Sequence, residues 1–237
     1  MSLAGHLKLS KLVVLYDSND ICLDGKLNTS FSENVEARVK AQGWNYIKVE
    51  DGQDLEAIGK AIEKANSQDE KPSLIEIKTI IGYGSSKQGT NKVHGAPLGG
   101  DDFAKAKEFY KWENKDFEIP EEIYETFKED LGKRGQEANK AWDDLMEAYK
   151  KAYPEAYQSL INGIERKLDD NFFDKIRKYS AEDKALASRA SGGEILQDLA
   201  KNNQNIWGGS ADLFSSNKTD IVGSPSFKDD PAGRNVW

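Results

Sequence analysis

Strand and helix signals alternate through the first hundred residues of the chain. Residues 12–16 form a continuous apolar run, typical of a parallel strand that is covered on both faces. Residues 46–50 and 73–81 predict two more strands. Apolar residues recur at helical spacing between them: Val35, Ala37, Val39 and Ala41 in one segment, and Leu55, Ile58, Ile62 and Ala65 in the next. Two consecutive β-α-β units predict a parallel sheet in an α/β fold.

Several residues predict where helices begin or end. Ser30 followed by Glu33 resembles a capping box for the first of these helices, and Gly43 offers its C-terminal stop. Pro120 and Pro154 stand where later helices can start, each followed by Glu.

Two polar loops follow the first and third predicted strands. Residues 17–25 ("DSNDICLDG") hold several short oxygen-bearing side chains, which suit an ordinary turn or a metal site. Residues 82–100 ("GYGSSKQGTNKVHGAPLGG") hold six glycines, which favour close approach of the backbone to a ligand. The second loop is neither GxGxxG nor GxxxxGK[ST], so dinucleotide and P-loop sites lack support. Parallel sheets bind ligands at the carboxyl ends of their strands, where both loops begin.

The character of the chain changes after residue 100. Residues 101–151 contain 15 acidic and 10 basic residues with scattered aromatic side chains, which predicts exposed helices forming a connector. A globular pattern resumes after Ser180, with a helix that turns Ile195, Leu196 and Leu199 inward, a short strand around Ile206 and Trp207, and a Gly-Gly turn. This is how a second α/β domain would begin.

Composition excludes several classes of function. The net charge of −8 argues against nucleic acid as a partner, because duplex binding needs clustered Lys and Arg. No apolar run is long enough to suggest a membrane partner. The single Cys22 favours the cytoplasm, and the two histidines exclude a His-rich zinc centre made by this chain alone. A strand that begins near residue 10 needs more neighbours than residues 1–98 supply, so we expect a fragment of something longer.

Four segments resemble, in order, successive motifs of the transketolase family of thiamine-diphosphate enzymes, most closely the bacterial ones. They are "SLAGHLKLSKLVVLYDSNDICLDG", "IGYGSSKQGTNKVHGAPLGG", "ASR" and "GGSADLFSSN". The resemblance implies three parts: residues 1–98 as the second half of the diphosphate-binding domain, 99–184 as a helical connector, and 185–237 as the N-terminal part of the pyrimidine-binding domain.

The resemblance also implies half of a metal site. Family members hold Mg²⁺ (or Ca²⁺) through an aspartate of a GDG motif, an asparagine side chain and a backbone carbonyl. The last two fall on Asn19 and Ile21, whereas the GDG motif would precede Met1. Magnesium takes octahedral oxygen ligands that are often shared with phosphates. On the residues alone, the pattern favours a turn or Asx-turn role for Asn19.

Further site residues follow from the same resemblance. His94 matches the histidine that reaches the cofactor diphosphate and the reacting substrate, and Ile81 matches an apolar cofactor contact. Arg189 and Ser216 match the pair that holds the phosphate of sugar substrates, since Arg offers a planar fork of donors. Asp212 matches an acid near the cofactor. His6 matches no catalytic position and we take it as structural.

The implied reaction is transfer of a two-carbon ketol unit from a ketose phosphate to an aldose phosphate, in a homodimer whose domains meet across subunits. We expect the fragment by itself to be inactive. Two alternatives remain open: a related thiamine-diphosphate synthase, and a binding module, which is either a non-catalytic remnant or a helical adaptor that uses the aromatic connector.

Overall fold

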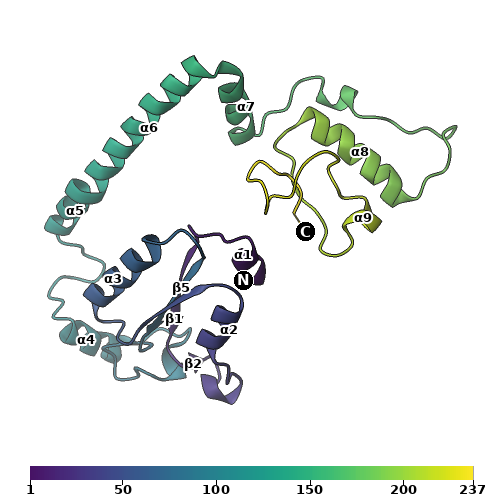
Figure 1. The fold of residues 1–237 in the computed structure, drawn as a ribbon. Helices are drawn as coiled ribbons and strands as arrows, with labels where there is room; N and C mark the ends of the chain where they lie inside the picture. The colour runs from purple at the N-terminus through teal and green to yellow at the C-terminus, as the bar shows by residue number, and fades with distance from the viewer. Residues whose placement is uncertain (237) are drawn as a thin grey trace. The chain divides into compact units, whose positions relative to one another are not determined.

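The computed structural model describes residues 1–236, which divide into two compact units (Figure 1). The first unit spans residues 1–120 and the second begins at Glu121. Each unit is described by itself. The three-part division into residues 1–98, 99–184 and 185–237 stays a prediction.

The first unit contains a parallel sheet, a small hairpin and four α-helices. Its strands are β1 (Val13–Ser18), β2 (Ile21–Cys22), β3 (Gly25–Lys26), β4 (Asn45–Val49) and β5 (Ser73–Lys78). Its helices are α1 (Ser2–His6), α2 (Val35–Ala41), α3 (Leu55–Asn66) and α4 (Gly100–Phe109), with short 3-10 turns η1 (Leu27–Thr29) and η2 (Asn91–Val93).

The parallel sheet has the strand order β1-β5-β4, which confirms the predicted α/β fold. Strand β5 lies in the centre although it comes last in the chain, with Ile75 opposite both Leu15 and Ile47. Four of its six residues are apolar or small and buried, as expected for a strand of a parallel sheet that is covered on both faces. Strands β2 and β3 form a separate antiparallel pair within the loop that follows β1.

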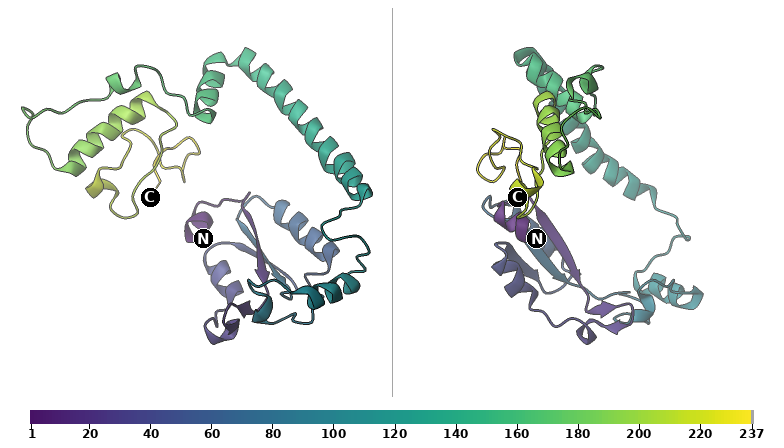
Figure 2. Two further views of the ribbon diagram at one scale, coloured as in Figure 1. Left: turned by 180° about the vertical axis from the view of Figure 1, so that it is seen from behind. Right: turned by 90° about the vertical axis from the view of Figure 1, so that its right-hand side faces the viewer.

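Two hydrophobic clusters cover the two faces of this sheet. On one face, Ile75 and Ile77 pack with Ala61 and Ala65 of α3. On the other face, Leu74 packs with Val39 of α2 and with the neighbouring Trp44, Val14 and Tyr16. Figure 2 shows α2 and α3 on opposite sides of the strands. The period of two along β5 therefore divides its side chains between the two helices.

Two predicted boundaries in the first unit were wrong. The N-cap of α2 is Asn34, whose Oδ1 accepts a hydrogen bond from the Ala37 amide, and not Ser30. Ser30 instead ends η1, where its amide donates to the Leu27 carbonyl. The strand predicted over residues 73–81 ends at Lys78, because its partners β1 and β4 end at Ser18 and Val49 and leave nothing to pair with.

The second unit is helical in its described part. It contains α5 (Glu121–Phe127), a π-helical segment η3 (Lys128–Gly132), α6 (Lys133–Ala152), α7 (Pro154–Ile164), a 3-10 turn η4 (Phe172–Lys175), α8 (Ser188–Asn202) and α9 (Phe214–Asn217). The predicted helix starts are confirmed, since α5 follows Pro120 directly and Pro154 is the first residue of α7. The strand predicted around residues 206–207 was wrong: Gly208 makes only an isolated bridge to Asn235.

An ion-pair network ties an extended segment to helix α8 in this unit. The Arg177 guanidinium donates to Asp198 Oδ2 at 2.7 Å and to Glu194 Oε2 at 2.6 Å, and the Tyr179 hydroxyl donates to the same Glu194 oxygen. The hydrogen bonds from Arg177 lower the pKa of Asp198 to about 2. Residues 177–179 are thereby held against the middle of α8.

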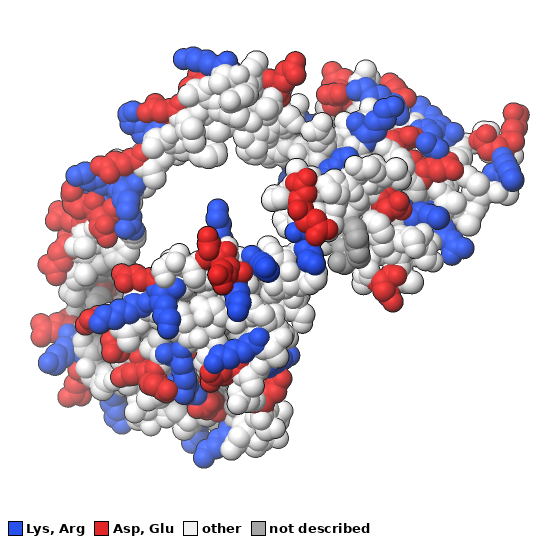
Figure 3. Space-filling view, in the orientation of Figure 1, with Lys and Arg blue, Asp and Glu red and all other residues white. Residues whose placement is uncertain are grey.

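Charged side chains of both signs are interspersed over the visible face of each unit (Figure 3). Over residues 1–236, no helix combines the length and apolar character that crossing a membrane requires.

Candidate functional site

The two polar loops predicted to carry the site leave neighbouring strands. Ser18 at the end of β1 pairs with Lys78 at the end of β5, so both loops begin at the same edge of the sheet. The loops are also joined directly, since the Asn91 side chain donates to the Leu23 carbonyl at 3.1 Å. The Thr79 hydroxyl donates to Asp17, and Lys78 Nζ lies 2.8 Å from Asp20 Oδ2. The structure thus assembles residues 17–25 and 79–98 into one surface.

Asn19 directly follows β1 and its amide group organises the first loop. Its Oδ1 accepts a hydrogen bond from the Ile21 amide at 3.1 Å, and its Nδ2 donates to Asp17 Oδ1 at 3.3 Å. Between them, Asp20 has a left-handed backbone with φ of 60°, which a short polar side chain tolerates. Asn19 and Ile21 therefore lie in one tight turn, both half-buried.

Ile81 lies in a turn of the second loop, just beyond the sheet. Its carbonyl accepts a hydrogen bond from the Gly89 amide at 2.8 Å. The next residue, Gly82, has φ of 64°, and a Cβ there would lie 2.6 Å from Val93 Cγ2. Glycine is required at this position because the chain turns back on itself against Val93, the residue before His94.

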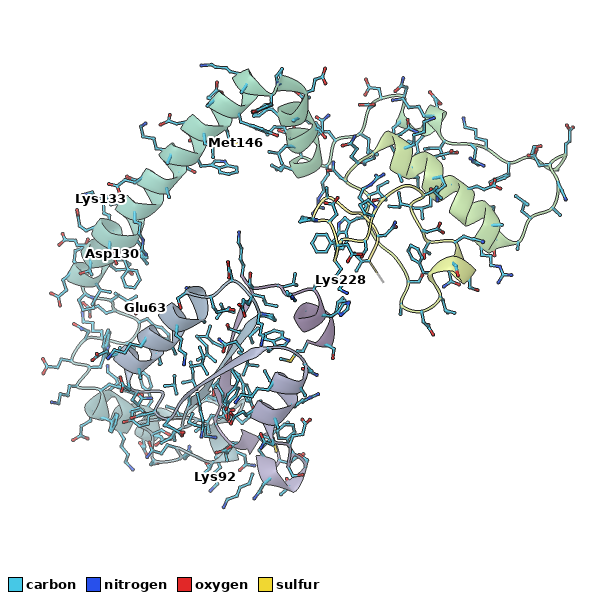
Figure 4. The ribbon with its side chains drawn as sticks, viewed as in Figure 1. Glu63, Lys92, Asp130, Lys133, Met146 and Lys228 are labelled. Carbon is cyan, nitrogen blue, oxygen red and sulfur yellow. The ribbon has the colours of Figure 1, made fainter. Side chains whose placement is uncertain are left out.

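His94 follows the short turn η2 on the exposed side of the second loop. Its backbone amide donates to the Asn91 carbonyl at 3.1 Å, and its side chain is exposed. Lys92 in the same turn extends away from the body of the first unit (Figure 4). An exposed imidazole held by a fixed backbone turn is available as a hydrogen-bond donor to an anion.

Sequence reasoning missed a polar cluster on the sheet beside the first loop. Glu76 of β5 accepts hydrogen bonds from the Ser18 hydroxyl at 2.8 Å and from the Tyr46 hydroxyl at 2.7 Å. Burial and the bond to Glu76 raise the pKa of Tyr46 well above its ordinary value. The signal was present, because Glu76 and Lys78 are two charged residues on one face of a strand that is otherwise buried.

This cluster forms one wall of a cavity of about 350 Å³. Its lining includes Tyr16, Ser18, Lys26, Phe31, Glu76 and Lys78. Of the predicted site residues, none lines it, although Ser18 and Asp20 flank Asn19 in the sequence and do. The cavity therefore adjoins the candidate site without containing it.

The remaining predicted residues lie in the second unit. Arg189 is the second residue of α8, Ser216 lies in α9, and Asp212 lies in the turn before α9; all three side chains are exposed. Helices α8 and α9 contact each other, and a Cβ at Gly193 would lie 2.6 Å from Lys218 Cβ, just after α9. This close packing holds together α8, which carries Arg189, and α9, which carries Ser216.

The donors in the first loop fit only part of a metal shell. The Asn19 side chain and the Ile21 carbonyl are neutral oxygen donors of the kind that Mg²⁺ and Ca²⁺ accept. Across the described residues 1–236, no group of three or more His, Cys, Asp or Glu side chains is placed to hold a metal ion. The turn can therefore contribute to a site that takes its carboxylate and phosphate ligands from elsewhere.

Comparison with known proteins gives consistent matches along the chain. The family model described as the transketolase, thiamine diphosphate binding domain matches residues 1–169. The transketolases of Geobacillus stearothermophilus and Streptococcus pyogenes are 49% and 46% identical, and each alignment covers 100% of this chain. The two alignments cover 36% and 32% of those proteins, so the chain spans about a third of their length.

Solved structures agree with the sequence matches. A transketolase mutant from Pichia stipitis in complex with xylulose 5-phosphate superposes with a TM-score of 0.93 at 36% identity, over 99% of this chain and 36% of that one. A Campylobacter jejuni transketolase gives a TM-score of 0.83 at 38% identity, over 99% of this chain and 35% of that one. With its parallel sheet, its joined loops and these matches along its whole length, the chain belongs to the transketolase family.

Proposed function

We propose that these residues work within a longer transketolase, which moves a two-carbon ketol unit from a ketose phosphate to an aldose phosphate. The observation that carries this proposal is the 49% identity to a transketolase over the whole chain, with both loop motifs joined at one sheet edge. Such an enzyme would act on sugar phosphates of the pentose phosphate pathway, as a homodimer in the cytoplasm. A Pichia stipitis transketolase has been solved with sedoheptulose 7-phosphate, which supports this substrate class.

The first loop would supply part of the cofactor site. Asn19 Oδ1 already accepts one hydrogen bond from Ile21, and an amide oxygen has a second lone pair for a cation. Asn19 and the Ile21 carbonyl would then hold Mg²⁺ or Ca²⁺ against the diphosphate. Ile81, His94 and Asp212 would make the other cofactor contacts. When bound, thiamine diphosphate supplies a nucleophilic carbon and an electron sink that protein side chains lack.

The side chains of this chain would bind and orient the substrate. His94 would donate a hydrogen bond both to the diphosphate and to the donor sugar, where developing negative charge strengthens the interaction. Arg189 and Ser216 would hold the distal phosphate, Arg through its fork of donors and Ser through its hydroxyl. The polypeptide of 237 residues alone would be inactive because its metal ligands are incomplete.

The two histidines of the chain give a matched test in the longer enzyme. We expect His94→Asn to lower ketol transfer on the order of 10²-fold, the usual effect of removing one donor from such a site. His6→Asn should leave the rate unchanged, since His6 is equally exposed but lies in α1. Equal effects of both substitutions would contradict the role of His94.

A second test addresses the metal ligand through binding and not through turnover. Asn19→Ala should weaken thiamine diphosphate binding in the presence of Mg²⁺, measured by titration calorimetry, while Asn139→Ala on the exposed face of α6 should not. An unchanged affinity for Asn19→Ala would remove it from the site. Sugar-phosphate transfer by the purified 237 residues would refute the proposed inactivity of the isolated chain.

A further inference from the structure

The first turn of helix α4 carries an acidic residue whose side chain is buried. Asp102 is only 6% exposed, whereas its neighbour Asp101 in the same helical turn is exposed. Charged side chains are rarely buried unless they are paired. The partners of Asp102 therefore show what the carboxylate holds in place.

The partners of Asp102 all belong to the loop that carries His94. Its Oδ1 accepts hydrogen bonds from the Ser86 amide at 2.9 Å and from the Ser86 hydroxyl at 2.7 Å. Its Oδ2 has no hydrogen-bond partner and lies 3.6 Å from Lys87 Nζ. The two bonds from Ser86 lower the pKa of Asp102, so the buried group stays ionised.

Lys87 extends the same tether across the loop. Its ammonium donates to the Leu98 carbonyl at 2.9 Å, which joins two points that are 11 residues apart. The segment between them contains η2 and His94. The Thr90 hydroxyl also donates to the Lys87 carbonyl at 2.6 Å, which fixes the start of that segment.

We infer that Asp102 is a positioning residue: it anchors the base of the loop through Ser86 and Lys87 and thereby sets the place of His94. The loop needs such an anchor because six of residues 82–100 are glycines, which lose the most conformational freedom on ordering. The buried carboxylate offsets the entropy that these glycines lose on ordering, because it accepts two hydrogen bonds from Ser86 and lies beside the Lys87 ammonium. The tether itself stands on the geometry, and only its effect on catalysis rests on the proposed function.

The tether is tested first in the 237-residue chain, without any reaction. In Asp102→Ala, amide hydrogen exchange over residues 86–94 should be faster by about tenfold or more, the change expected on losing hydrogen bonds to a charged group. Trypsin should also cut sooner after Lys87 and Lys92. Asp101→Ala, which removes the same charge one residue away, should change neither. Asp102→Asn keeps an acceptor for Ser86 and should lie between the two.

The effect on His94 is tested in the longer transketolase. Asp102→Ala should lower kcat by about tenfold while the KM for the aldose phosphate stays within about twofold, because Arg189 and Ser216 hold that phosphate elsewhere. Asp102→Asn should restore part of kcat. Partial unfolding would also lower the apparent kcat at constant KM, so kcat is expressed per active site titrated with thiamine diphosphate, and a loss that remains after this correction reports positioning.

The exchange measurement tests the tether, and the kinetic measurement tests the proposed role of His94. If exchange in the loop is unchanged in both Asp102 variants, the inference is wrong, whatever His94 does. If the loop loosens but neither Asp102→Ala nor His94→Asn affects turnover, the tether stands and the proposed role of His94 fails. Should Asp102→Ala not fold, Asp102→Asn and Ser86→Ala carry the same exchange measurement.

Discussion

Replacing Gly82 by alanine should destabilise the first unit through two separate causes. The φ of 64° at Gly82 is left-handed, which costs an L-residue about 1–2 kcal/mol. The new Cβ would also lie 2.6 Å from Val93 Cγ2 and 3.1 Å from both Val93 Cβ and Cγ1. Overpacking of this kind costs about 1–3 kcal/mol. Together we expect a loss of about 2–5 kcal/mol, against a total stability of about 5–15 kcal/mol for a domain.

A double-mutant cycle separates the two causes. Val93→Ala removes both γ-carbons and leaves only the tight contact of 3.1 Å to Cβ, so Gly82→Ala in that background should keep the backbone cost of about 1–2 kcal/mol and lose most of the steric one. Gly100→Ala is the matched control, because a Cβ at Gly100 meets no atom within 4 Å and its φ is not positive. We expect that control to be neutral or slightly stabilising in helix α4.

The assay is urea unfolding followed by circular dichroism, with hydrogen exchange of β5 amides to report on the first unit. The steric part of the reasoning fails if Val93→Ala gives no relief. The backbone part fails if Gly82→Ala and Gly100→Ala agree within about 0.5 kcal/mol, the usual size of a neutral surface substitution. Either failure would mean that the loop does not close on Val93 as described.

Two further predictions concern helix α2 and the Arg177 network. Asn34→Ala should destabilise the first unit by about 0.5–2 kcal/mol through loss of the N-cap, whereas Ser30→Ala should have no such effect in the same unfolding assay. The pKa of Asp198 is lowered from 3.8 to about 2 in the folded chain. As the pH falls, the Asp198 carboxylate is therefore protonated in the unfolded chain before it is protonated in the folded one. The free energy of unfolding of the second unit should fall as the pH drops from about 4 to about 2. Arg177→Leu should flatten this part of the curve of unfolding midpoint against pH; an unchanged slope would show that the ion pairs do not contribute.

The sequence predicted the elements of the first unit better than their ends. Apolar periodicity found β1, β4, β5 and the two helices between them, because each has one face in the core. It placed the α2 cap at Ser30, since Ser-x-x-Glu fits a capping box, but the short turn η1 already uses Ser30. It extended β5 through Ile81, since strand length depends on partners that composition does not reveal.

The contacts between loops needed the structure. Two loops at the carboxyl ends of parallel strands could be placed at one sheet edge from the pattern alone. The link from Asn91 to Leu23 depends on β1 and β5 being neighbours, and the order of strands is not visible in local periodicity. The burial of Asp102 was hidden for the same reason, since its partner Ser86 is 16 residues away and both lie in a segment that looks solvated.

The central place of β5 has a consequence for how the chain acquires its shape. Among the described strands, β1 pairs only with β5, and Ser18 meets Lys78 across a gap of 60 residues, as their contact through Lys78 Nζ records. A further 60 residues must therefore follow Ser18 before Lys78 is available to pair with it, and pairing over such a distance is slow. Until then the edge of β1 that β5 covers stays unpaired, and an unpaired strand edge favours intermolecular pairing and aggregation of the growing polypeptide.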